Sequence, residues 1–266
     1  MPELPEVEMF RRALEEGATG RKIHQLKVYD AKVLRCPESQ LVEGLVGHFF
    51  LPSQRIGKYL FVPLSSGQVL VIHFGLTGSL AFFEEAEDPP RFTRVAFLME
   101  SGSHLAYVCP RKFGRLDIGP DVQSLQKARQ LAEDAATISW EDFLHHLGQT
   151  RRMVKTVLLD QSVAAGVGNW IADEILFQAK IYPERRVADL SEEERKRMFD
   201  RMKEIIQTAL AVEGDYEALP AHFLIHRRGW TEVSPAFCEN CTGETDYIKV
   251  GGRATYFCAI CQKKPD

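Results

Sequence analysis

Four cysteines near the C-terminus have the spacing of a metal site. Cys238 and Cys241 form one C-x-x-C pair, and Cys258 and Cys261 form a second pair after 16 intervening residues. Two such pairs supply the four thiolates of a tetrahedral zinc site. Because four of the six cysteines crowd into this short segment, a metal site is favoured over a disulfide framework. We therefore predict one structural Zn2+ ion bound by these four residues.

The segment between the two cysteine pairs predicts a β-hairpin. It reads YIKVGGRATYF and alternates like two strands around Gly251-Gly252, which places Arg253 at the tip. A planar guanidinium held at a rigid tip can bind a phosphate. A solvated turn arginine without any ligand is the alternative, and the sequence leaves both interpretations open.

A second group of residues has the pattern of an anion site. In the run DQSVAAGVGNWIADEILFQA, two glycines precede Asn169, which is the predicted N-cap of an amphipathic helix through Ile171, Ile175 and Leu176. A glycine-lined helix N-terminus presents free N–H groups to anions. The run is not a dinucleotide fingerprint, because Ile171 stands where the third glycine would be. An ordinary corner between two helices is the alternative.

Basic residues recur at three places that are predicted to be turns or strand ends. The run PRKFGR is the most suggestive, because an exposed aromatic residue such as Phe113 between cations can stack on bases or wedge between them. A solvated charged surface is the alternative at each place. The basic residues are Lys58, Arg111, Lys112, Arg115, Arg151, Arg152 and Lys155.

The composition limits which classes of protein fit. Among 266 residues, 33 Lys plus Arg stand against 37 Asp plus Glu, for a formal net charge of −4. A nucleic-acid-binding protein of this balance must concentrate its positive charge locally. No run approaches the roughly 20 apolar residues of a membrane span, and the first residues lack the features of a signal peptide. We therefore expect a cytoplasmic protein without a membrane partner.

Three kinds of segment must position these residues. Val7, Phe10 and Leu14 predict a helix over residues 5–16. Short β-rich runs separated by turns follow up to about residue 118 and predict a sandwich or barrel. A long helical region comes next, and the cysteines lie in a short third unit.

Together these motifs resemble those of the formamidopyrimidine-DNA glycosylase (Fpg, MutM and Nei) family. The resemblance rests on MPELPEVE, GKYL, HFGLTGSL, PRKFG, LLDQSVAAGVGNWIADEILFQAKIYP and the terminal C-x-x-C…GGR…C-x-x-C. It implies a multi-domain α+β fold, with an N-terminal helix and two-layer β-sandwich over 1–122, a helix-two-turn-helix domain over 123–222 and a four-cysteine zinc-finger hairpin over 223–266. It also implies a monomer that binds damaged double-stranded DNA between its two lobes.

The start of the chain fits the chemistry that this family implies. Removal of Met1 would leave Pro2 with a secondary amine at the terminus. An α-amino group has an ordinary pKa of about 8, and the positive end of the following helix favours its neutral form. That amine could attack C1′ of a damaged nucleotide and form an iminium with the opened sugar, which splits base excision and strand cleavage into two steps. Proline after Met1 also occurs simply because it suits a helix start.

The resemblance implies roles for four further residues in catalysis. Glu3 would protonate the departing base or the sugar oxygen, and Glu6 would support it. Lys58 would assist β-elimination and contact a phosphate. Arg253 would bind phosphate and assist δ-elimination.

The resemblance also implies a set of DNA contacts. A damaged base reaches the amine only if it is rotated out of the stack, which leaves a hole in the duplex. Leu76, Arg111 and Phe113 match the positions that fill this hole, with Arg111 facing the orphaned base and Phe113 wedging the next pair. The remaining implied contacts are Lys58, His73, Arg151, Lys155, Asn169 and Arg253.

Several residues depart from the family pattern. Leu76 stands where Met is common, Cys109 where Asp is usual, and Lys112 where a second Arg is usual. The connection VEGDYEALPAHFLIHRRGWTEVSPAF is shorter than in members that favour 8-oxoguanine, and FLIHRRGW is similar to the plant branch. Because the longer connection folds over the flipped base, its absence predicts a preference for ring-opened, further oxidised or bulkier bases.

The prediction is therefore a bifunctional DNA glycosylase and AP lyase of base excision repair, which nicks the strand by β- or β,δ-elimination. A non-catalytic zinc-finger protein that binds damaged or bent duplex DNA is one alternative, and replacing Pro2 or Glu3 would distinguish it. A Nei-like glycosylase for pyrimidine lesions is the other, and the context of Phe113 favours the Fpg-like interpretation over it.

Overall fold

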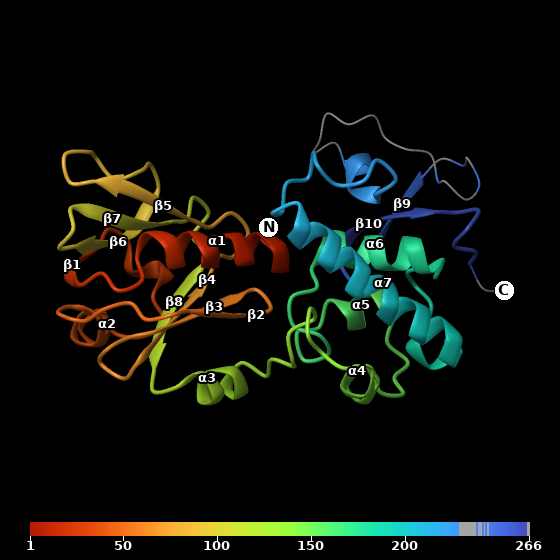
Figure 1. The fold of residues 1–266 in the computed structure, drawn as a ribbon. Coiled ribbons are helices and arrows are strands. Elements are labelled where there is room, and N and C mark those ends of the chain that lie inside the picture. Colours follow the sequence, from red (N-terminus) through yellow and green to blue (C-terminus); the bar gives the residue numbers. More distant parts are fainter. Residues whose placement is uncertain (229–237, 239–240, 242, 244, 265–266) are drawn as a thin grey trace. The chain divides into compact units, whose positions relative to one another are not determined.

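The computed structural model describes residues 1–228, 238, 241, 243 and 245–264. The chain divides into two compact units (Figure 1), Met1–Pro2 with Glu6–Gln130 and Glu3–Pro5 with Leu131–Asp266. The division after Gln130 lies beyond the boundary predicted at 122, because helix α3 (Val122–Ala128) packs on the first unit, with Leu125 against Gly119. The three-domain division otherwise stays a prediction. None of the helices in the described ranges is long and apolar enough to cross a membrane.

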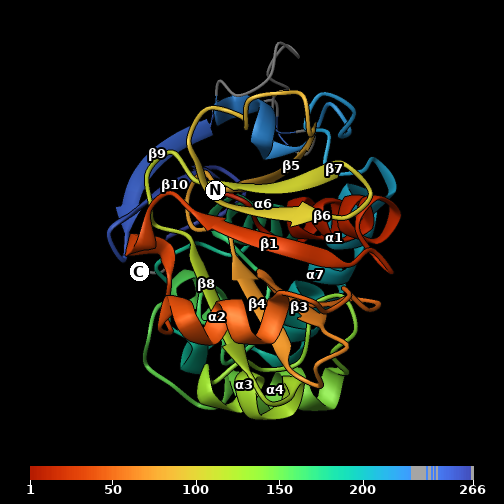
Figure 2. The ribbon, with the colours of Figure 1, turned by 90° about the vertical axis from the view of Figure 1, so that its left-hand side faces the viewer.

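The first unit is the predicted sandwich of two four-stranded antiparallel sheets. Their strand orders are β1-β6-β7-β5 and β2-β3-β4-β8, and Figure 2 shows them as two layers. Buried side chains from both sheets, such as Phe97 and Ile72, form one core. The strands are β1 (Ile23–Val28), β2 (Gln54–Ile56), β3 (Tyr59–Pro63), β4 (Val69–His73), β5 (Ser79–Glu84), β6 (Thr93–Met99), β7 (Ser103–Val108) and β8 (Arg115–Gly119).

Besides α3, two further helices and a 3-10 turn, η1 (Ala31–Val33), belong to this unit. Helix α1 (Leu4–Gly17) confirms the helix predicted at the start of the chain, and its Val7 and Leu14 belong to the sandwich core. Helix α2 (Glu38–Leu45) lies within the region predicted to be β-rich, and its Leu41 packs in the same core. Eight residues make only about two helical turns, which is too short for hydrophobic periodicity to identify.

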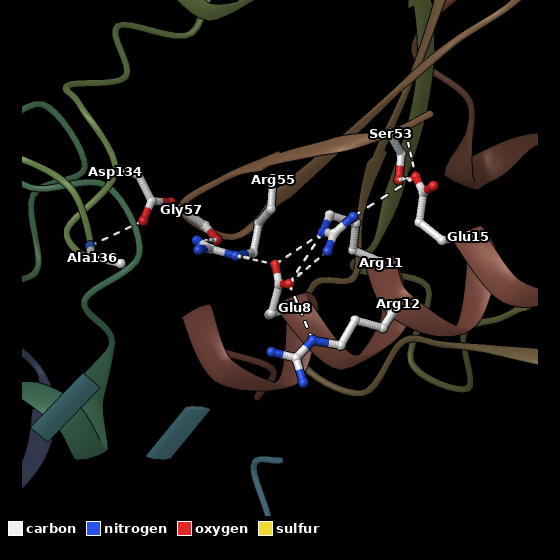
Figure 3. Close-up of polar contacts among 9 residues, drawn as sticks. All are labelled: Glu8, Arg11, Arg12, Glu15, Ser53, Arg55, Gly57, Asp134 and Ala136. Carbon is white, nitrogen blue, oxygen red and sulfur yellow. Dashed lines mark hydrogen bonds and ion pairs between the residues drawn. The ribbon is translucent and has the colours of Figure 1, made fainter. Parts of the chain in front are cut away.

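A polar cluster joins helix α1 to the turn between β2 and β3 (Figure 3). Glu8 accepts hydrogen bonds from Arg11 at 2.9 Å and from Arg55 at 3.2 Å, and Arg55 also donates to the carbonyl of Gly57 at 3.2 Å. Burial alone would raise the pKa of Glu8, but the hydrogen bonds and charges of Arg11 and Arg55 lower it below its ordinary value. The ionised Glu8 therefore stabilises the turn that carries Lys58.

The second unit is built around helix α6 (Asn169–Ala179). Nine of its eleven residues are buried, so the prediction of an amphipathic helix was wrong. A helix that is buried on all sides needs neighbours around its whole circumference. The other helices of this unit are α4 (Trp140–Leu147), α5 (Val154–Leu158) and α7 (Glu192–Ala211), with the 3-10 turns η2 (Val187–Asp189) and η3 (Leu224–Arg228).

The predicted hairpin between the cysteine pairs is confirmed. Strands β9 (Thr245–Val250) and β10 (Arg253–Cys258) pair antiparallel. Gly251 and Gly252 form the turn with φ values of 55° and 78°, in the left-handed region that favours glycine. A Cβ on Gly251 would lie 2.7 Å from Cγ2 of Thr156, so the hairpin tip lies against α5.

Candidate functional site

The carboxylate of Glu3 caps helix α6. Glu3 is 2% exposed, and it accepts hydrogen bonds from the backbone N–H groups of Trp170 and Ile171 at 3.0 and 3.3 Å. N–H groups in the first turn of a helix have no partner within the helix, and the positive end of the helix dipole favours a negative charge there. Helix α6 therefore fixes Glu3, the residue next to Pro2, and the N–H groups of its first turn stabilise a negative charge on the Glu3 carboxylate.

Gly168 makes this capping possible. The sequence predicted Asn169 as the N-cap, but the structure places Gly168 there and Asn169 at the first helical position. A Cβ on Gly168 would lie 2.0 Å from Cδ of Glu3, so only glycine leaves room for the carboxylate. The predicted anion site at this helix end is thus filled by the protein's own carboxylate.

Asn169 links helix α6 to the hairpin. Its side-chain Nδ2 donates to the carbonyl of Ala254 in β10 at 2.9 Å. Its Oδ1 is buried and has no hydrogen-bond partner among the described atoms. Asn169, which the resemblance predicts to bind a phosphate, therefore also links two segments within the second unit.

Lys155 lies in the interior, which differs from the predicted DNA contact. Its Nζ is 2.6 Å from Oδ1 of Asp173, and it donates to the carbonyl of Ala254 at 2.8 Å and to Oγ1 of Thr255 at 2.6 Å. Burial lowers the pKa of Lys155, while the charge of Asp173 acts against this shift. An ammonium group has three donors, and here all three have protein partners. Lys155 therefore joins α5 to β10.

Asp173 connects three segments of the second unit. Besides Lys155, its carboxylate forms a buried ion pair with Arg228 of η3 and accepts a hydrogen bond from the N–H of Tyr256 at 3.2 Å. The Arg228 guanidinium lies 4.9 Å from the ring centroid of Tyr256. Burial raises the pKa of Asp173, and the charges of Arg228 and Lys155 oppose that rise. This network fixes β10, and so the position of the hairpin, on helix α6.

The two other predicted DNA contacts of the second unit are accessible. Arg253 is exposed at the hairpin tip, and Arg151 is exposed just before α5. Oγ1 of Thr255 donates to the carbonyl of Arg253 at 3.1 Å, which holds the backbone of the tip. Both guanidinium groups are therefore free to reach a phosphate from a fixed backbone.

In the first unit, His73 lines a cavity of about 350 Å3 that is rich in arginine. Burial, and then the charges of Lys58, Arg115 and Arg129, lower the pKa of His73 to about 4. The N–H of Gly75 donates to its Nδ1 at 3.3 Å. His73 is therefore neutral at pH 7 and carries its proton on Nε2, as a hydrogen-bond donor. The lining residues are Arg35, Tyr59, Val71, His73, Arg115, Asp117, Ala128 and Arg129.

Two of the three residues predicted to fill the hole in the duplex, Arg111 and Phe113, lie on one turn, residues 109–114, which we call the Arg111 turn. Arg111 and Phe113 are exposed, Phe113 by 50%, and the Arg111 guanidinium lies 5.4 Å from the Phe113 ring centroid. Lys112 has a φ of 57° and forms an ion pair with Asp30 at 2.5 Å. The backbone thus directs Lys112 towards Asp30 and leaves Arg111 and Phe113 accessible to solvent.

The loop that carries Leu76 lies beside the Arg111 turn. Gly75 has a φ of 62°, and a Cβ there would lie 2.4 Å from the carbonyl carbon of Phe113. Leu76 itself is half-buried. The loop of Leu76 therefore lies next to the turn that holds Arg111 and Phe113.

Arg94 supports the Arg111 turn, and sequence reasoning missed it. Its guanidinium donates to the carbonyls of Cys109 and Pro110 at 2.9 and 3.1 Å. Cys109, which stands where the family has Asp, accepts a hydrogen bond on its sulfur from the N–H of Gly114 at 3.3 Å. Arg94 lies in a strand about 15 residues away, so no local motif identifies it.

The remaining predicted catalytic residues are Lys58, which is buried in the turn between β2 and β3, and two residues at the start of the chain. Pro2 and Glu6 are half-buried, and Met1 is exposed. While Met1 is present, the nitrogen of Pro2 is an amide and cannot act as a nucleophile. Any amine chemistry at Pro2 therefore requires the removal of Met1.

The four cysteines converge, and they can hold a metal ion. Their sulfur atoms all lie within 4.8 Å of one another, with Cys238 to Cys261 at 3.5 Å and Cys241 to Cys258 at 3.4 Å. Zn–S bonds of about 2.3 Å in a tetrahedron place sulfur atoms roughly 3.8 Å apart. The donor set and its spacing therefore fit a tetrahedral thiolate site.

Comparison with known proteins agrees with this arrangement along most of the chain. Residues 1–116 match the formamidopyrimidine-DNA glycosylase N-terminal domain, and residues 130–219 match the H2TH domain of the same enzymes. A formamidopyrimidine-DNA glycosylase of Pelotomaculum thermopropionicum is 33% identical, over 99% of both chains. One of Arabidopsis thaliana is 30% identical, over 99% of this chain and 71% of its own length.

Solved structures show the same fold. The Lactococcus lactis Fpg in complex with DNA containing an abasic site is 28% identical, with a TM-score of 0.86 over 99% of this chain and 100% of that one. A MutM in complex with DNA containing carbocyclic 8-oxo-G is 28% identical, with a TM-score of 0.87 over the same shares. The two-domain match and the whole-length similarity leave one assignment: this chain belongs to the formamidopyrimidine-DNA glycosylase family.

Proposed function

We propose that this chain is a DNA glycosylase and AP lyase that removes a damaged base from duplex DNA through the amine of Pro2 and then nicks the strand. The observation that carries the proposal is the capping of α6 by Glu3. A terminus that supplies a nucleophile must be held in place, and Glu3 fixes the backbone at the adjacent residue. Its relatives bound to DNA that contains an abasic site or 8-oxo-G make damaged duplex DNA the substrate class.

The chemistry follows from a secondary amine next to a carboxylate. The Pro2 nitrogen attacks C1′ of the damaged nucleotide, the C1′–base bond breaks, and the base leaves with the electron pair of that bond and takes a proton from water. The sugar ring then opens to an iminium at C1′, the amine N–H proton is lost and the ring oxygen gains a proton. An ionised Glu3 takes up the first proton and supplies the second, which fits its place at the helix N-terminus. A proton is then lost from C2′ of the iminium to water, and the C3′–O bond breaks with the 3′-phosphate as the leaving group, which cleaves the strand.

Basic and polar side chains of the two units provide phosphate contacts in this proposal. Lys58, His73, Arg151, Asn169 and Arg253 bind the backbone of the damaged strand, and Lys58 and Arg253 also assist elimination. Leu76, Arg111 and Phe113 fill the space that the flipped nucleotide leaves. For Lys155 we propose a positioning role, because its ammonium group already has three protein partners.

We also propose that the metal at the four cysteines is Zn2+. Four thiolates in two C-x-x-C pairs form the usual donor set of a structural zinc ion, without an open position for catalysis. Bound there, zinc would join the ends of the hairpin and keep Arg253 on a fixed strand.

The first prediction concerns the nucleophile. The native protein with Met1 removed should form a covalent adduct with a duplex containing one abasic site when borohydride is added. An extra residue retained before Pro2 should reduce the adduct to the level of a blank, because the nitrogen is then an amide. Pro2→Gly should react slowly, as a primary amine. Denaturing gel electrophoresis measures the adduct.

If the native protein binds the duplex and contains zinc but forms no adduct, Pro2 is not the nucleophile. The non-catalytic DNA-binding alternative would then replace the enzyme.

The second prediction concerns Glu3 and Gly168. Glu3→Gln should slow excision in single turnovers by about 100- to 10,000-fold, the usual contribution of a positioned proton-transfer group. Gly168→Ala should also slow it, because the new Cβ would displace the Glu3 carboxylate. Glu16→Gln, which changes an exposed carboxylate on helix α1, is the matched control and should excise at the native rate. A native rate in Glu3→Gln would refute the proton-transfer role.

The third prediction concerns the metal. Purified protein should contain about one zinc per chain. Cys258→Ser should lower the metal affinity more than about 100-fold, because it removes a metal ligand, and loss of a residue that only hydrogen-bonds to a ligand already costs about 10- to 100-fold. The same variant should bind abasic-site DNA more weakly, because Arg253 loses its fixed strand. Cys36→Ser, which changes a cysteine outside the cluster, should alter neither property. Metal-free protein with native DNA affinity would contradict the proposal.

The fourth prediction concerns the lesion. In matched duplexes opposite cytosine, a formamidopyrimidine base should be excised faster than 8-oxoguanine, because the connection that would cover the flipped base is short. Of this connection, the structure describes the part up to Arg228, and the residues from 229 to 237 lie outside the described ranges. Single-turnover rates of the two excisions provide the test, and equal or faster excision of 8-oxoguanine would overturn the prediction.

A further inference from the structure

Phe92 is an exposed aromatic residue in an unusual conformation. It is 41% exposed, and its φ of 68° lies in the left-handed region, where a bulky residue is an outlier. It belongs to none of the buried clusters of the first unit's described core. Strained residues persist where the surroundings hold them, and they gather at functional sites. Burial in the core therefore does not account for this side chain.

Two guanidinium groups lie near the ring of Phe92. The Cζ atom of Arg91 is 4.5 Å from the ring centroid, and that of Arg94 is 5.9 Å away. Arg91 is exposed, whereas Arg94 is directed to the carbonyls of the Arg111 turn. An exposed ring next to an exposed arginine is the combination that binds a nucleic acid strand, through stacking on a base and contact with a phosphate.

Backbone hydrogen bonds place Phe92 next to the Arg111 turn. The N–H of Cys109 donates to the carbonyl of Phe92 at 3.1 Å, and Cys109 begins the turn. Arg94 then ties both segments together through the carbonyls of Cys109 and Pro110. The protein thus presents two adjacent pairs of an arginine and an exposed phenylalanine: Arg91 with Phe92, and Arg111 with Phe113.

We propose that Arg91 and Phe92 form a second DNA-contacting element beside the Arg111 turn. The Phe92 ring stacks on a base next to the lesion that loses its stacking partner when the duplex opens, and Arg91 contacts a phosphate of the same strand. The inference rests on the proposed function, because it takes damaged duplex DNA as the ligand. It adds a specificity element for opened duplex, since a fully stacked base offers no free face to the ring.

Two variants of Phe92 test this proposal. Phe92→Asn removes the ring and keeps a residue that tolerates a positive φ. Phe92→Trp keeps an aromatic face and adds a fluorescent group. Phe49→Asn is the matched control, because Phe49 is a similarly exposed phenylalanine of the same unit, at 40%. The probe is a duplex with one tetrahydrofuran abasic analogue, and intact duplex of the same sequence is compared. Fluorescence anisotropy gives Kd, and thermal unfolding checks the fold.

The expected result is a Kd for the abasic duplex that rises about 5- to 150-fold in Phe92→Asn, the range for loss of one base–aromatic stack. The Kd for intact duplex should change less. Phe92→Trp should bind like the native protein, and the emission of its added indole should fall when the abasic duplex binds, since stacking on a base quenches it.

Two results would overturn the proposal. One is a Kd in Phe92→Asn equal to that of Phe49→Asn. The other is equal loss of affinity in both Phe92 variants without a change of indole emission, which would assign Phe92 to support of the turn alone. In either case, borohydride trapping by the native protein would still succeed, so failure of this inference is distinguishable from failure of the proposed function.

Discussion

Helix α6 is the element on which the second unit depends, and buried carboxylates at its first turns organise the segments around it. Glu3 occupies its N-terminus, and Asp173 receives Lys155, Arg228 and the N–H of Tyr256. A helix with buried sides and buried charges is stable only if every carboxylate has its partners, because removing one partner of a buried pair typically costs about 3–5 kcal/mol. The hairpin with Arg253 and the start of the chain are therefore placed by the same helix.

Glu174 extends this arrangement to the connection before the hairpin. Its carboxyl group accepts hydrogen bonds from the N–H of Leu224 at 2.6 Å and from Gln178 at 2.8 Å. Burial raises its pKa to about 8, against the opposing effect of those hydrogen bonds. At neutral pH this group is largely protonated. Burial raises the pKa of Asp173 as well, but there the charges of Arg228 and Lys155 oppose the rise. Two adjacent acidic residues on one helix thus serve different purposes, because their neighbours differ.

The sequence predicted the elements whose signal is local and missed the contacts that are not. Helix α1, the sandwich and the β9-β10 hairpin follow from periodicity, strand-rich runs and cysteine spacing. The burial of Lys155 depends on Asp173 and on Thr255, which is 100 residues away. The N-cap at Gly168 depends on Glu3 from the other end of the chain. No spacing rule contains these partners, so the family resemblance could propose Glu3, Lys155 and Asn169 as site residues, but the sequence could not assign their contacts.

The capping of α6 by Glu3 also sets an order of events during synthesis. The hydrogen bond from Trp170 joins residues 167 positions apart, so it cannot form until α6 has been made. At roughly 5–20 residues per second, that interval lasts about 8 to 30 s. Throughout it, the first residues of the nascent chain are not yet buried, and a peptidase can reach the bond after Met1. Removal of Met1, on which the proposed chemistry depends, can therefore precede the folding that buries Glu3.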